Sequence, residues 1–362
     1  MRERLLTLSD VAEWQTLLPA RASVFASVEY ASIYQQHSGY DARLFLVESD
    51  EAAVAYAFFQ RPVHSLPFAS TLAERYWDTL TPEYTGPTAL GAGEAVADLR
   101  FRERFSTFCR ENRIVAEFAH LHPWNWPVEL LETEGVEVNR EIVYVDLTLS
   151  EEQLWQDSLT YACRKNIKRS KRENIRVIEA TSPGDIREFH RIYIQTMERN
   201  QALTQYYFSL EYFLAFFERM PQHARFVLAI YHDQVVAGTL YLHDDIDVYS
   251  YLGGADHAFQ NARPTNAVVY DTILWARRNG KKRLILGGSY EPDDGIFRYK
   301  ASFSPLRARF HTYKKIHLPQ IYNSLCRAWS EHYGLSSVDT YFPSYRATPR
   351  PVTESAQSED TD

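Results

Sequence analysis

The sequence predicts an α/β protein made of two similar domains in tandem. Its 362 residues are enough for two packed cores. Segments with strand character alternate along the chain with helical segments, which favours central strands covered by helices on both sides. One pattern also occurs twice, because residues 43–59 can be laid over residues 225–241 without a gap. Both copies predict a strand, a polar turn and a second strand, although so few positions are identical that chance similarity between two hairpins remains an alternative.

The elements of the first half follow from its apolar pattern. Residues 43–47 and 54–59 are the two apolar arms of the first hairpin. We expect a helix over residues 94–112 and strands over residues 114–118 and 142–147. A first domain covering residues 1–150 would end just after the last of these strands.

The second half repeats this alternation with more helices. A third strand should follow its hairpin and end at Gly253 and Gly254, and a helix should start near Pro264 and stop before Gly280. Residues 347–362 hold too little apolar surface to order themselves, so we expect a disordered tail there. The third strand covers residues 246–252, and the other predicted strands cover residues 175–179 and 284–286. The other predicted helices cover residues 150–159, 185–200 and 210–219.

The strongest candidate for chemistry is Lys300. An apolar run at residues 284–286 predicts a buried strand that ends on Gly287 and Gly288, where the backbone can turn sharply and approach a ligand closely. Lys300 follows among aromatic residues in the pattern Phe297-x-x-Lys-x-x-Phe303. For an arbitrary lysine, a position on the surface of a short helix would be the ordinary interpretation.

This strand, double-glycine loop and lysine pattern resembles the C-terminal signature of the Fem family, the aminoacyltransferases that build peptidoglycan cross-bridges, and of the related GNAT-like acyltransferases. Three more segments resemble that family in the same order, and the resemblance covers residues 28–329. The segments are an acceptor loop at residues 80–87, a basic helix running into a strand at residues 161–177, and an Arg-then-aromatic segment at residues 196–199 and 206–208. The chain departs from some members in having no long, charged helical hairpin of the kind used for tRNA contact.

The resemblance implies two GNAT-like domains with mixed central sheets flanked by helices. Residues 1–150 would form the acceptor side and residues 151–335 the catalytic domain. Lys300 would be the catalytic residue that stabilises the oxyanion formed at the attacked carbonyl. The substrate-binding residues would be Arg199, Tyr207, Tyr84, Gly287, Gly288 and Phe297.

A basic stretch from Arg164 to Arg176 is the candidate donor site. Lys165, Lys168, Arg169 and Arg172 recur at three- and four-residue spacing, which places them on one helical face beside Arg164. Such a face could bind phosphates of tRNA, of a nucleotide-linked acceptor or of CoA, and a simple solvated helix face is the alternative.

The predicted donor is aminoacyl-tRNA, with acyl-CoA as the alternative. GNAT enzymes that use acyl-CoA generally hold its pyrophosphate on a glycine-rich loop at a helix N-terminus. Residues 260–266 stand at that place, contain no glycine and include Pro264, which has no N–H to donate. We therefore predict transfer of an aminoacyl group to an amine on a cell-wall precursor or natural-product intermediate, with no bound cofactor. Transfer from acyl-CoA to a sugar-linked or small-molecule amine, and a non-catalytic anion-binding module, remain the alternatives.

Other function classes have less support in the sequence. Cys109, Cys163 and Cys326 are widely spaced and indicate neither a disulfide framework nor a zinc site, so a reducing cytoplasm is the expected location. No apolar stretch reaches the roughly twenty residues needed to span a bilayer. His120 and His122 could be half a metal site, but ordinary structural histidines are the simpler interpretation. The net charge of -8 argues against bulk binding of nucleic acid over the whole surface and leaves room for one basic patch.

Overall fold

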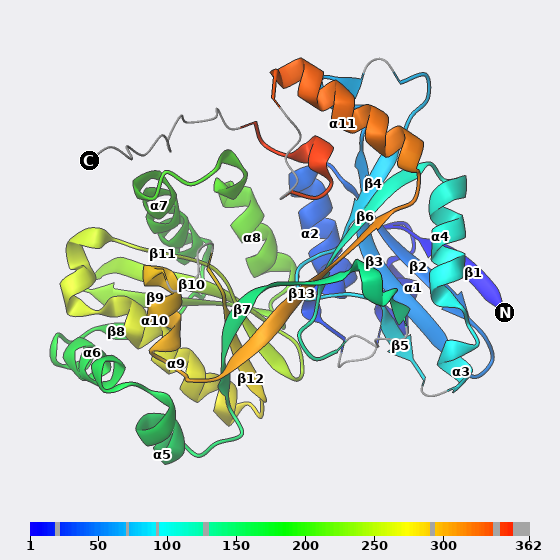
Figure 1. Cartoon of the computed structure of the whole chain (residues 1–362). Coiled ribbons are helices and arrows are strands. Elements are labelled where there is room, and N and C mark those ends of the chain that lie inside the picture. Colours follow the sequence, from blue (N-terminus) through cyan, green and yellow to red (C-terminus); the bar gives the residue numbers. More distant parts are fainter. Residues whose placement is uncertain are drawn as a thin grey trace, which may run out of the picture.

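The computed structural model describes residues 1–18, 22–69, 72–91, 94–125, 130–289, 294–335 and 341–349. Within these residues, one continuous mixed sheet runs through both halves of the molecule (Figure 1). Its spatial order is β1, β2, β3, β4, β6, β13, β7, β12, β11, β10, β9 and β8, with β5 paired to β3. The strands are β1 (Arg2–Leu6), β2 (Asp41–Glu48), β3 (Ala53–Pro62), β4 (Trp77–Leu80), β5 (Thr88–Leu90), β6 (Ile114–Leu121), β7 (Val136–Asp146), β8 (Arg176–Glu179), β9 (Ala224–Tyr231), β10 (Gln234–His243), β11 (Asp247–Ala255), β12 (Arg283–Gly287) and β13 (Arg307–Ile316).

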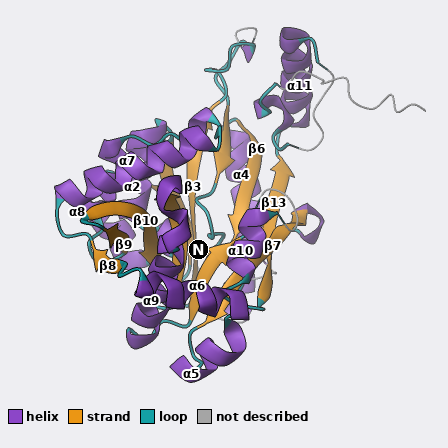
Figure 2. Cartoon of the chain, turned by 90° about the vertical axis from the view of Figure 1, so that its left-hand side faces the viewer, coloured by secondary structure: helices purple, strands orange, loops and turns teal. Residues whose placement is uncertain are grey.

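Helices cover both faces of this sheet, as expected from the sequence (Figure 2). One apolar core lies under α1, α2, α7 and α8 and is continuous across the two halves. On the other face, α6 and α9 cover the second half and α4 covers the first. The helices are α1 (Val11–Leu17), α2 (Val28–Ser38), α3 (Glu94–Ala97), α4 (Phe101–Glu111), α5 (Glu151–Gln153), α6 (Tyr161–Arg172), α7 (Pro183–Arg199), α8 (Leu210–Arg219), α9 (Pro264–Arg278), α10 (Gly295–Ala301) and α11 (Pro319–Tyr333). No helix in these ranges is both long and apolar enough to cross a membrane.

The two halves of the sheet repeat one pairing pattern. In the first half, β1, β2, β3 and β4 are successively antiparallel, and β4 is parallel to β6. In the second half, β8, β9, β10 and β11 are successively antiparallel, and β11 is parallel to β12. The hairpin echo predicted from the sequence corresponds to β2–β3 and β9–β10. It is therefore a true structural repeat.

The halves exchange their last strands at the centre of the sheet. β7 comes from the first half of the chain and pairs with β12, whereas β13 comes from the end of the chain and pairs with β6. β7 and β13 also pair with each other, and Figure 1 shows them side by side between the two lobes. Helix α11 then packs on the first half through Trp329 and Tyr322, which share one core with Val63 and Val115. Residues 307–335, assigned to the second domain from the sequence, thus lie against the first half, while the division at residue 150 stays a prediction.

Several element boundaries differ from the expected ones. The helix expected over residues 94–112 is split into α3 and α4, because Arg100 adopts a left-handed conformation with φ +46°. The segment 150–159 continues from α5 into a π-helical turn. Strand β11 does not end at its glycines but continues to Ala255. A Cβ on Gly254 would lie 2.7 Å from the carbonyl oxygen of Ile192, so glycine allows α7 to pack closely on the strand.

The start of the predicted disordered tail is ordered, contrary to expectation. Ala347 is buried, and its carbonyl oxygen accepts a hydrogen bond of 3.0 Å from the indole of Trp329. Just before it, Tyr345 and Arg346 both donate to the buried carboxylate of Asp78, at 3.0 and 2.5 Å. These bonds hold the chain through Ala347. Residues 350–362 of the predicted tail lie outside the described residues.

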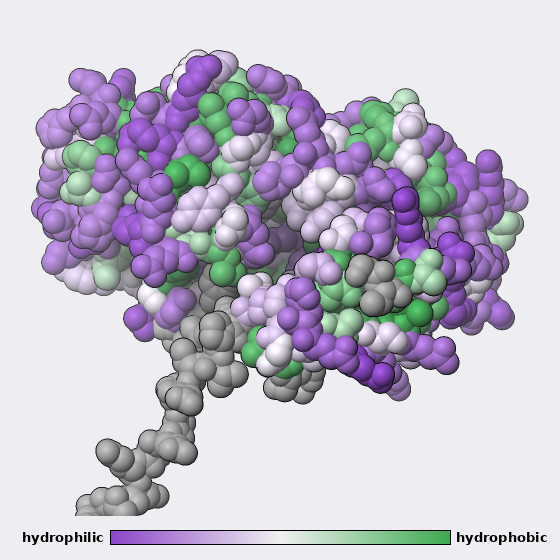
Figure 3. Space-filling model, turned by 90° about the horizontal axis from the view of Figure 1, so that it is seen from above, coloured by the Kyte–Doolittle hydropathy of each residue, from purple (hydrophilic) through white to green (hydrophobic). Residues whose placement is uncertain are grey.

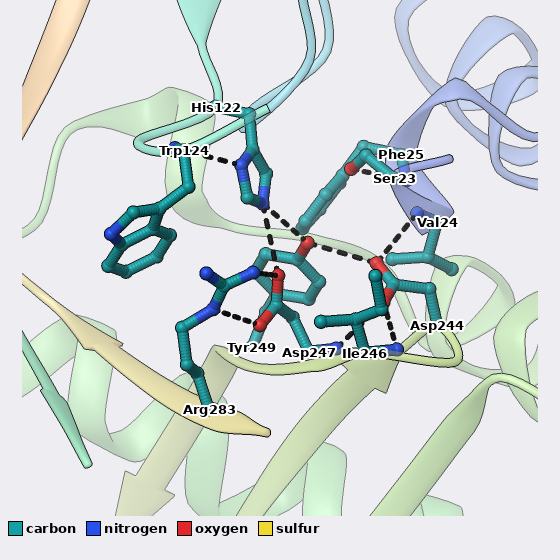
Figure 4. Close-up of polar contacts among 10 residues, drawn as sticks. All are labelled: Ser23, Val24, Phe25, His122, Trp124, Asp244, Ile246, Asp247, Tyr249 and Arg283. Carbon is teal, nitrogen blue, oxygen red and sulfur yellow. Dashed lines mark hydrogen bonds and ion pairs between the residues drawn. The ribbon is translucent and has the colours of Figure 1, made fainter. Parts of the chain in front are cut away.

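A buried polar network joins the two halves (Figure 4). Tyr249 of β11 donates to Asp244 at 3.0 Å, and the same carboxylate oxygen accepts the backbone N–H of Val24 from the first half at 3.4 Å. His122, just after β6, completes the connection through Nε2, which lies 3.1 Å from the hydroxyl oxygen of Tyr249. The backbone N–H of Trp124 donates to Nδ1 of His122 at 3.2 Å, so Nε2 is the nitrogen that carries the hydrogen.

Asp247 is the charged centre of this network. It is fully buried and accepts two hydrogen bonds from Arg283, at 2.6 and 2.8 Å. Nε2 of His122 lies 3.3 Å from the same carboxylate. Burial alone would raise the pKa of Asp247, but the bonds from His122 and Arg283 outweigh burial and hold the pKa below its ordinary value. Asp247 is thus a buried carboxylate that accepts hydrogen bonds from both halves and whose charge is compensated by Arg283.

We predict that Asp247→Ala lowers the free energy of unfolding by about 3–5 kcal/mol, because it leaves Arg283 and His122 without their buried partner. Urea denaturation of the purified variant measures this change. The matched control is Glu188→Ala, which removes a carboxylate from an exposed pair with Arg191 and should cost no more than about 1 kcal/mol. Equal losses in the two variants would mean that the network contributes no more than a surface ion pair.

Candidate functional site

Lys300 lies where the sequence predicted it, beside the double-glycine loop. Helix α10 begins after Asp294, whose side chain accepts a hydrogen bond of 2.7 Å from the backbone N–H of Phe297. One turn later, the partly buried Lys300 side chain turns back to the end of β12. Its Nζ donates to the carbonyl oxygen of Gly288 at 2.5 Å. The helix cap and this bond fix the position of the amine.

Tyr84 brings the first half of the chain to the same point. It follows β4 in a left-handed conformation with φ +48°. A Cβ placed on Gly287 would lie 3.4 Å from Nζ of Lys300 and 3.5 Å from the hydroxyl oxygen of Tyr84. Gly287 itself has φ +79°, which favours glycine. The absent side chain at residue 287 therefore leaves room between an amine from one half and a phenol from the other.

Aromatic rings from both halves support Tyr84. Its ring centroid lies 5.2 Å from that of Phe310, 5.4 Å from that of Tyr249 and 5.9 Å from that of Phe25. Tyr84 also lines a cavity of about 340 Å³ between the halves. Other residues that line this cavity are Ser23, Thr85, Thr88, His122, Trp124 and Ile246.

The charge on Lys300 is adjusted by its surroundings. Burial lowers the pKa of Lys300 to about 8, while the nearby carboxylates of Asp294 and Glu83 oppose this shift and Arg140 adds to it. The pKa of Glu83 is raised, since the surrounding protein reduces the hydration of its carboxylate more than Arg140 and Lys300 stabilise it. Glu83 nevertheless keeps an exposed side chain. A carboxylate that is surrounded by protein atoms but still reaches solvent is expected in a cleft.

Figure 3 shows a recess between the two lobes of the molecule when it is viewed from above.

Arg140 of β7 adds a second cation near Lys300. Its guanidinium donates to the carbonyl oxygen of Ser289 at 3.1 Å, and a Cβ on Gly288 would lie 2.9 Å from its Cδ. The double-glycine loop is thus bordered by Lys300, Tyr84 and Arg140, with Glu83 in electrostatic contact.

Sequence reasoning did not identify Glu83 or Arg140. Glu83 precedes Tyr84 in the predicted acceptor loop, so its position next to a candidate residue was a usable signal. Arg140 lies in a polar, exposed part of β7 that was not predicted as a strand. Only the pairing of β7 with β13 and β12 places it at the site.

Three predicted substrate-binding residues lie apart from this centre or have another role. Phe297 is buried in the core of the second half, and the guanidinium of Arg307 lies 5.2 Å from its ring centroid, so Phe297 packs instead of facing a ligand. Arg199, at the end of α7, donates to the carbonyl oxygen of Ala255 at 3.0 Å. Tyr207 is 38 % exposed and follows a 3₁₀ turn. Among the described residues, no hydrogen bond, ion pair or ring contact joins Arg199 or Tyr207 to Lys300 or Tyr84.

The predicted donor residues on α6 separate into two groups. Arg164 points back along the chain, and its Nη1 donates to the carbonyl oxygens of Trp155, Gln156 and Leu159 at 2.6–3.1 Å. Arg169 lies 3.8 Å from the carboxylate of Glu173. The remaining cations have exposed side chains that form no ion pair within the described part of the chain; they are Lys165, Lys168 and Arg172. Arg164 is therefore a structural residue and not part of an exposed cationic face.

Comparison with known proteins supports this description of the fold. Residues 160–301 match the family model of the acetyltransferase (GNAT) domain. No curated protein sequence matches the chain. The structure of FemX is similar with a TM-score of 0.67 and 12% identity, covering 90% of this chain and 99% of that one.

Two further structures have the same architecture. One is the C-terminal domain (DUF2156) of a protein from Agrobacterium fabrum assigned as a lysylphosphatidylglycerol synthetase, with a TM-score of 0.54, 13% identity, and coverage of 87% of this chain and 96% of that one. The other is a conserved protein of unknown function from Bacteroides thetaiotaomicron, with a TM-score of 0.57, 13% identity, and coverage of 85% and 97%. Identities this low show the fold alone. Residues 160–301 thus match the GNAT domain model, and the chain shares the fold of FemX along most of its length.

Proposed function

We propose that the protein forms an amide bond by transferring an aminoacyl group from aminoacyl-tRNA to an amine acceptor. A cell-wall precursor or a natural-product intermediate would carry that amine. The observation that carries the proposal is that Lys300 and Tyr84 meet at Gly287. Lys300 lies within the residues that match the GNAT domain model, and Tyr84 comes from the first half of the chain. Both groups can donate a hydrogen bond to a carbonyl oxygen that becomes negatively charged.

The proposed reaction is a simple acyl transfer. The acceptor amine attacks the ester carbonyl, a C–N bond forms, and the C–O bond to the ribose breaks. One proton leaves the amine and one is gained by the ribose oxygen, so the step is balanced. The ester is already activated, so the protein mainly aligns the reactants and stabilises the oxyanion with the Lys300 ammonium.

The choice of a tRNA donor over CoA is supported by the first turn of α9. Pro264, its first residue, is buried and has no N–H. Asn266 is also buried, and its side-chain amide lies 3.8 Å from Sγ of Cys163 on α6. The side chain of Asn266 thus faces α6, and Pro264 removes one of the N–H groups that a pyrophosphate would need at this helix start. The match of residues 160–301 to the GNAT model keeps transfer from acyl-CoA as the second candidate.

We expect Lys300→Ala to lower turnover by at least about a hundredfold with the fold intact, because removal of one oxyanion donor typically costs that much. The measurement follows radiolabelled amino acid from charged total tRNA to a panel of amines, beside a parallel series with acyl-CoA donors. Circular dichroism of the variant controls for folding. Near-normal turnover of Lys300→Ala would remove Lys300 from the mechanism. Transfer from acyl-CoA alone would replace the tRNA proposal with the second candidate.

The pKa of Lys300 predicts a pH dependence. With a pKa of about 8, the side chain is mostly ammonium below pH 8 and mostly neutral amine above it. We therefore expect kcat/KM to fall as the pH rises through about 8, since the neutral amine stabilises an oxyanion less well. The acceptor amine adds an ascending limb, which should move with the pKa of the acceptor, whereas the descending limb should not. In Lys300→Arg the descending limb should shift to higher pH, and an unshifted limb would assign it to another group.

A further inference from the structure

We propose that one face of α6, together with two neighbouring rings, binds the single-stranded end of a polynucleotide. This inference rests on the proposed function, because the occupant would be the 3′ end of the donor RNA. We call this region the α6 surface. It consists of Trp155, Tyr161, Lys165, Lys168, Arg172 and Tyr270.

Helix α6 has two sharply different faces. Cys163, Ile167 and Ser170 are buried and face α9 and the sheet. Residues 161, 165, 168 and 172 recur at the spacing of one helical face and are all exposed. Tyr161 keeps 76 % of its surface exposed, the largest value among the exposed large hydrophobic side chains of the described residues. A ring left in water at the head of a row of cations contributes little to folding and is available for a ligand.

Cations and rings alternate across the α6 surface. Nζ of Lys168 lies 5.8 Å from the ring centroid of Trp155, and Nζ of Lys171, which borders the α6 surface, lies 5.5 Å from that of Tyr270. The rings of Trp155 and Tyr270 are themselves in edge contact at 5.4 Å. Partly exposed rings interleaved with cations are the arrangement used for unpaired nucleotides, whose bases stack while their phosphates bind Lys and Arg.

Three carboxylates near the α6 surface are paired with cations, whereas Glu152 and Asp157, close to Trp155 in the chain, are exposed and form no ion pair within the described residues. Glu173 lies 3.8 Å from Arg169, and Glu151 lies 3.8 Å from Arg277. Asp271 accepts a hydrogen bond of 3.1 Å from Arg225. Because the whole chain has a net charge of -8, a polyanion is repelled over much of the molecule and attracted here.

The α6 surface leads to the reaction centre. The backbone N–H of Thr160, the residue that caps α6, donates to the carbonyl oxygen of Ser302 at 2.9 Å. Ser302 lies two residues after Lys300, just beyond α10. A strand that follows α6 from Arg172 to Tyr161 covers about 17 Å at 1.5 Å per residue and arrives beside the helix that carries the catalytic lysine.

Unpaired RNA fits this surface better than a duplex does. Bases within a helix are stacked on each other and cannot lie on protein rings, whereas a single-stranded end exposes both ring faces and phosphates. CoA offers one base, and its phosphates lie close to that base, so it would use only part of the rings and cations between Tyr161 and Arg172. The geometry therefore points to a single strand several nucleotides long.

The test uses a fluorescein-labelled, non-acylated single-stranded RNA of about twelve nucleotides ending in CCA, so that no catalysis is required. Fluorescence anisotropy measures its affinity for the full chain over a salt series. We expect Tyr161→Ala to weaken binding about 5- to 150-fold, the range expected when one base no longer stacks, and Tyr161→Phe to retain it. Lys165→Glu should weaken binding. It should also make the slope of log K against log salt concentration shallower by about 0.7 for each phosphate that the protein no longer neutralises.

The matched control is Arg187→Glu, which makes the same charge change at an exposed position on α7 and should leave the affinity nearly unchanged. Three results would each overturn the proposal that the α6 surface binds single-stranded RNA. They are equal effects of Lys165→Glu and Arg187→Glu, no effect of Tyr161→Ala, and tighter binding of a duplex of the same length.

Failure of the α6 surface is distinguishable from failure of the proposed function. If the α6 variants bind RNA normally while Lys300-dependent transfer from aminoacyl-tRNA is intact, the α6 surface alone is refuted. If RNA binds at α6 but no aminoacyl group is transferred to any amine, the proposed reaction alone is refuted.

Discussion

The pairing of β7 with β13 is the constraint on which the rest of the molecule depends. Residues 136–143 of β7 pair with β13, and residues 143–146 pair with β12. In turn, β13 pairs with β6 of the first half. Each half is thus completed by a strand that enters it from the other part of the chain. Rotation of one half against the other would break strand hydrogen bonds, whereas two domains on a flexible linker would move freely.

This rigidity matters because the candidate site draws on both halves. Tyr84 comes from the first half and Lys300 from the second, and catalysis by positioning requires their separation to be held within a fraction of an ångström. The buried network supports the same geometry. Tyr249 is held by Asp244 and His122 and packs its ring against that of Tyr84. The sheet sets the position of the halves, and the network sets the position of the ring.

The sequence was informative where local pattern and tertiary structure agree. The repeated hairpin, the basic helix and the strand that ends on Gly287 were all predictable, since each depends on spacing within a short segment. Residues 136–141 were not, because they are polar and form a strand only through β13, which lies far away in the chain. Arg140 was missed for the same reason. The burial of Phe297 in a core was not predictable, because an aromatic residue beside a catalytic candidate has the same appearance in sequence whether it contacts a ligand or fills a core.

The electrostatics of the centre favour a transient charge over a permanent one. Lys300 already donates to the carbonyl oxygen of Gly288 and lies near the carboxylates of Glu83 and Asp294. A substrate anion would have to compete with these groups, whereas a neutral ester gains its negative charge only as it is attacked, beside a donor already in place. Phosphates of a donor would be bound elsewhere, at the exposed cations of α6. Such an arrangement would give the two sites different roles. The cations of α6 would bind the donor phosphates equally in the ground state and the transition state, whereas the interaction of Lys300 with the oxyanion would strengthen as the reaction proceeds.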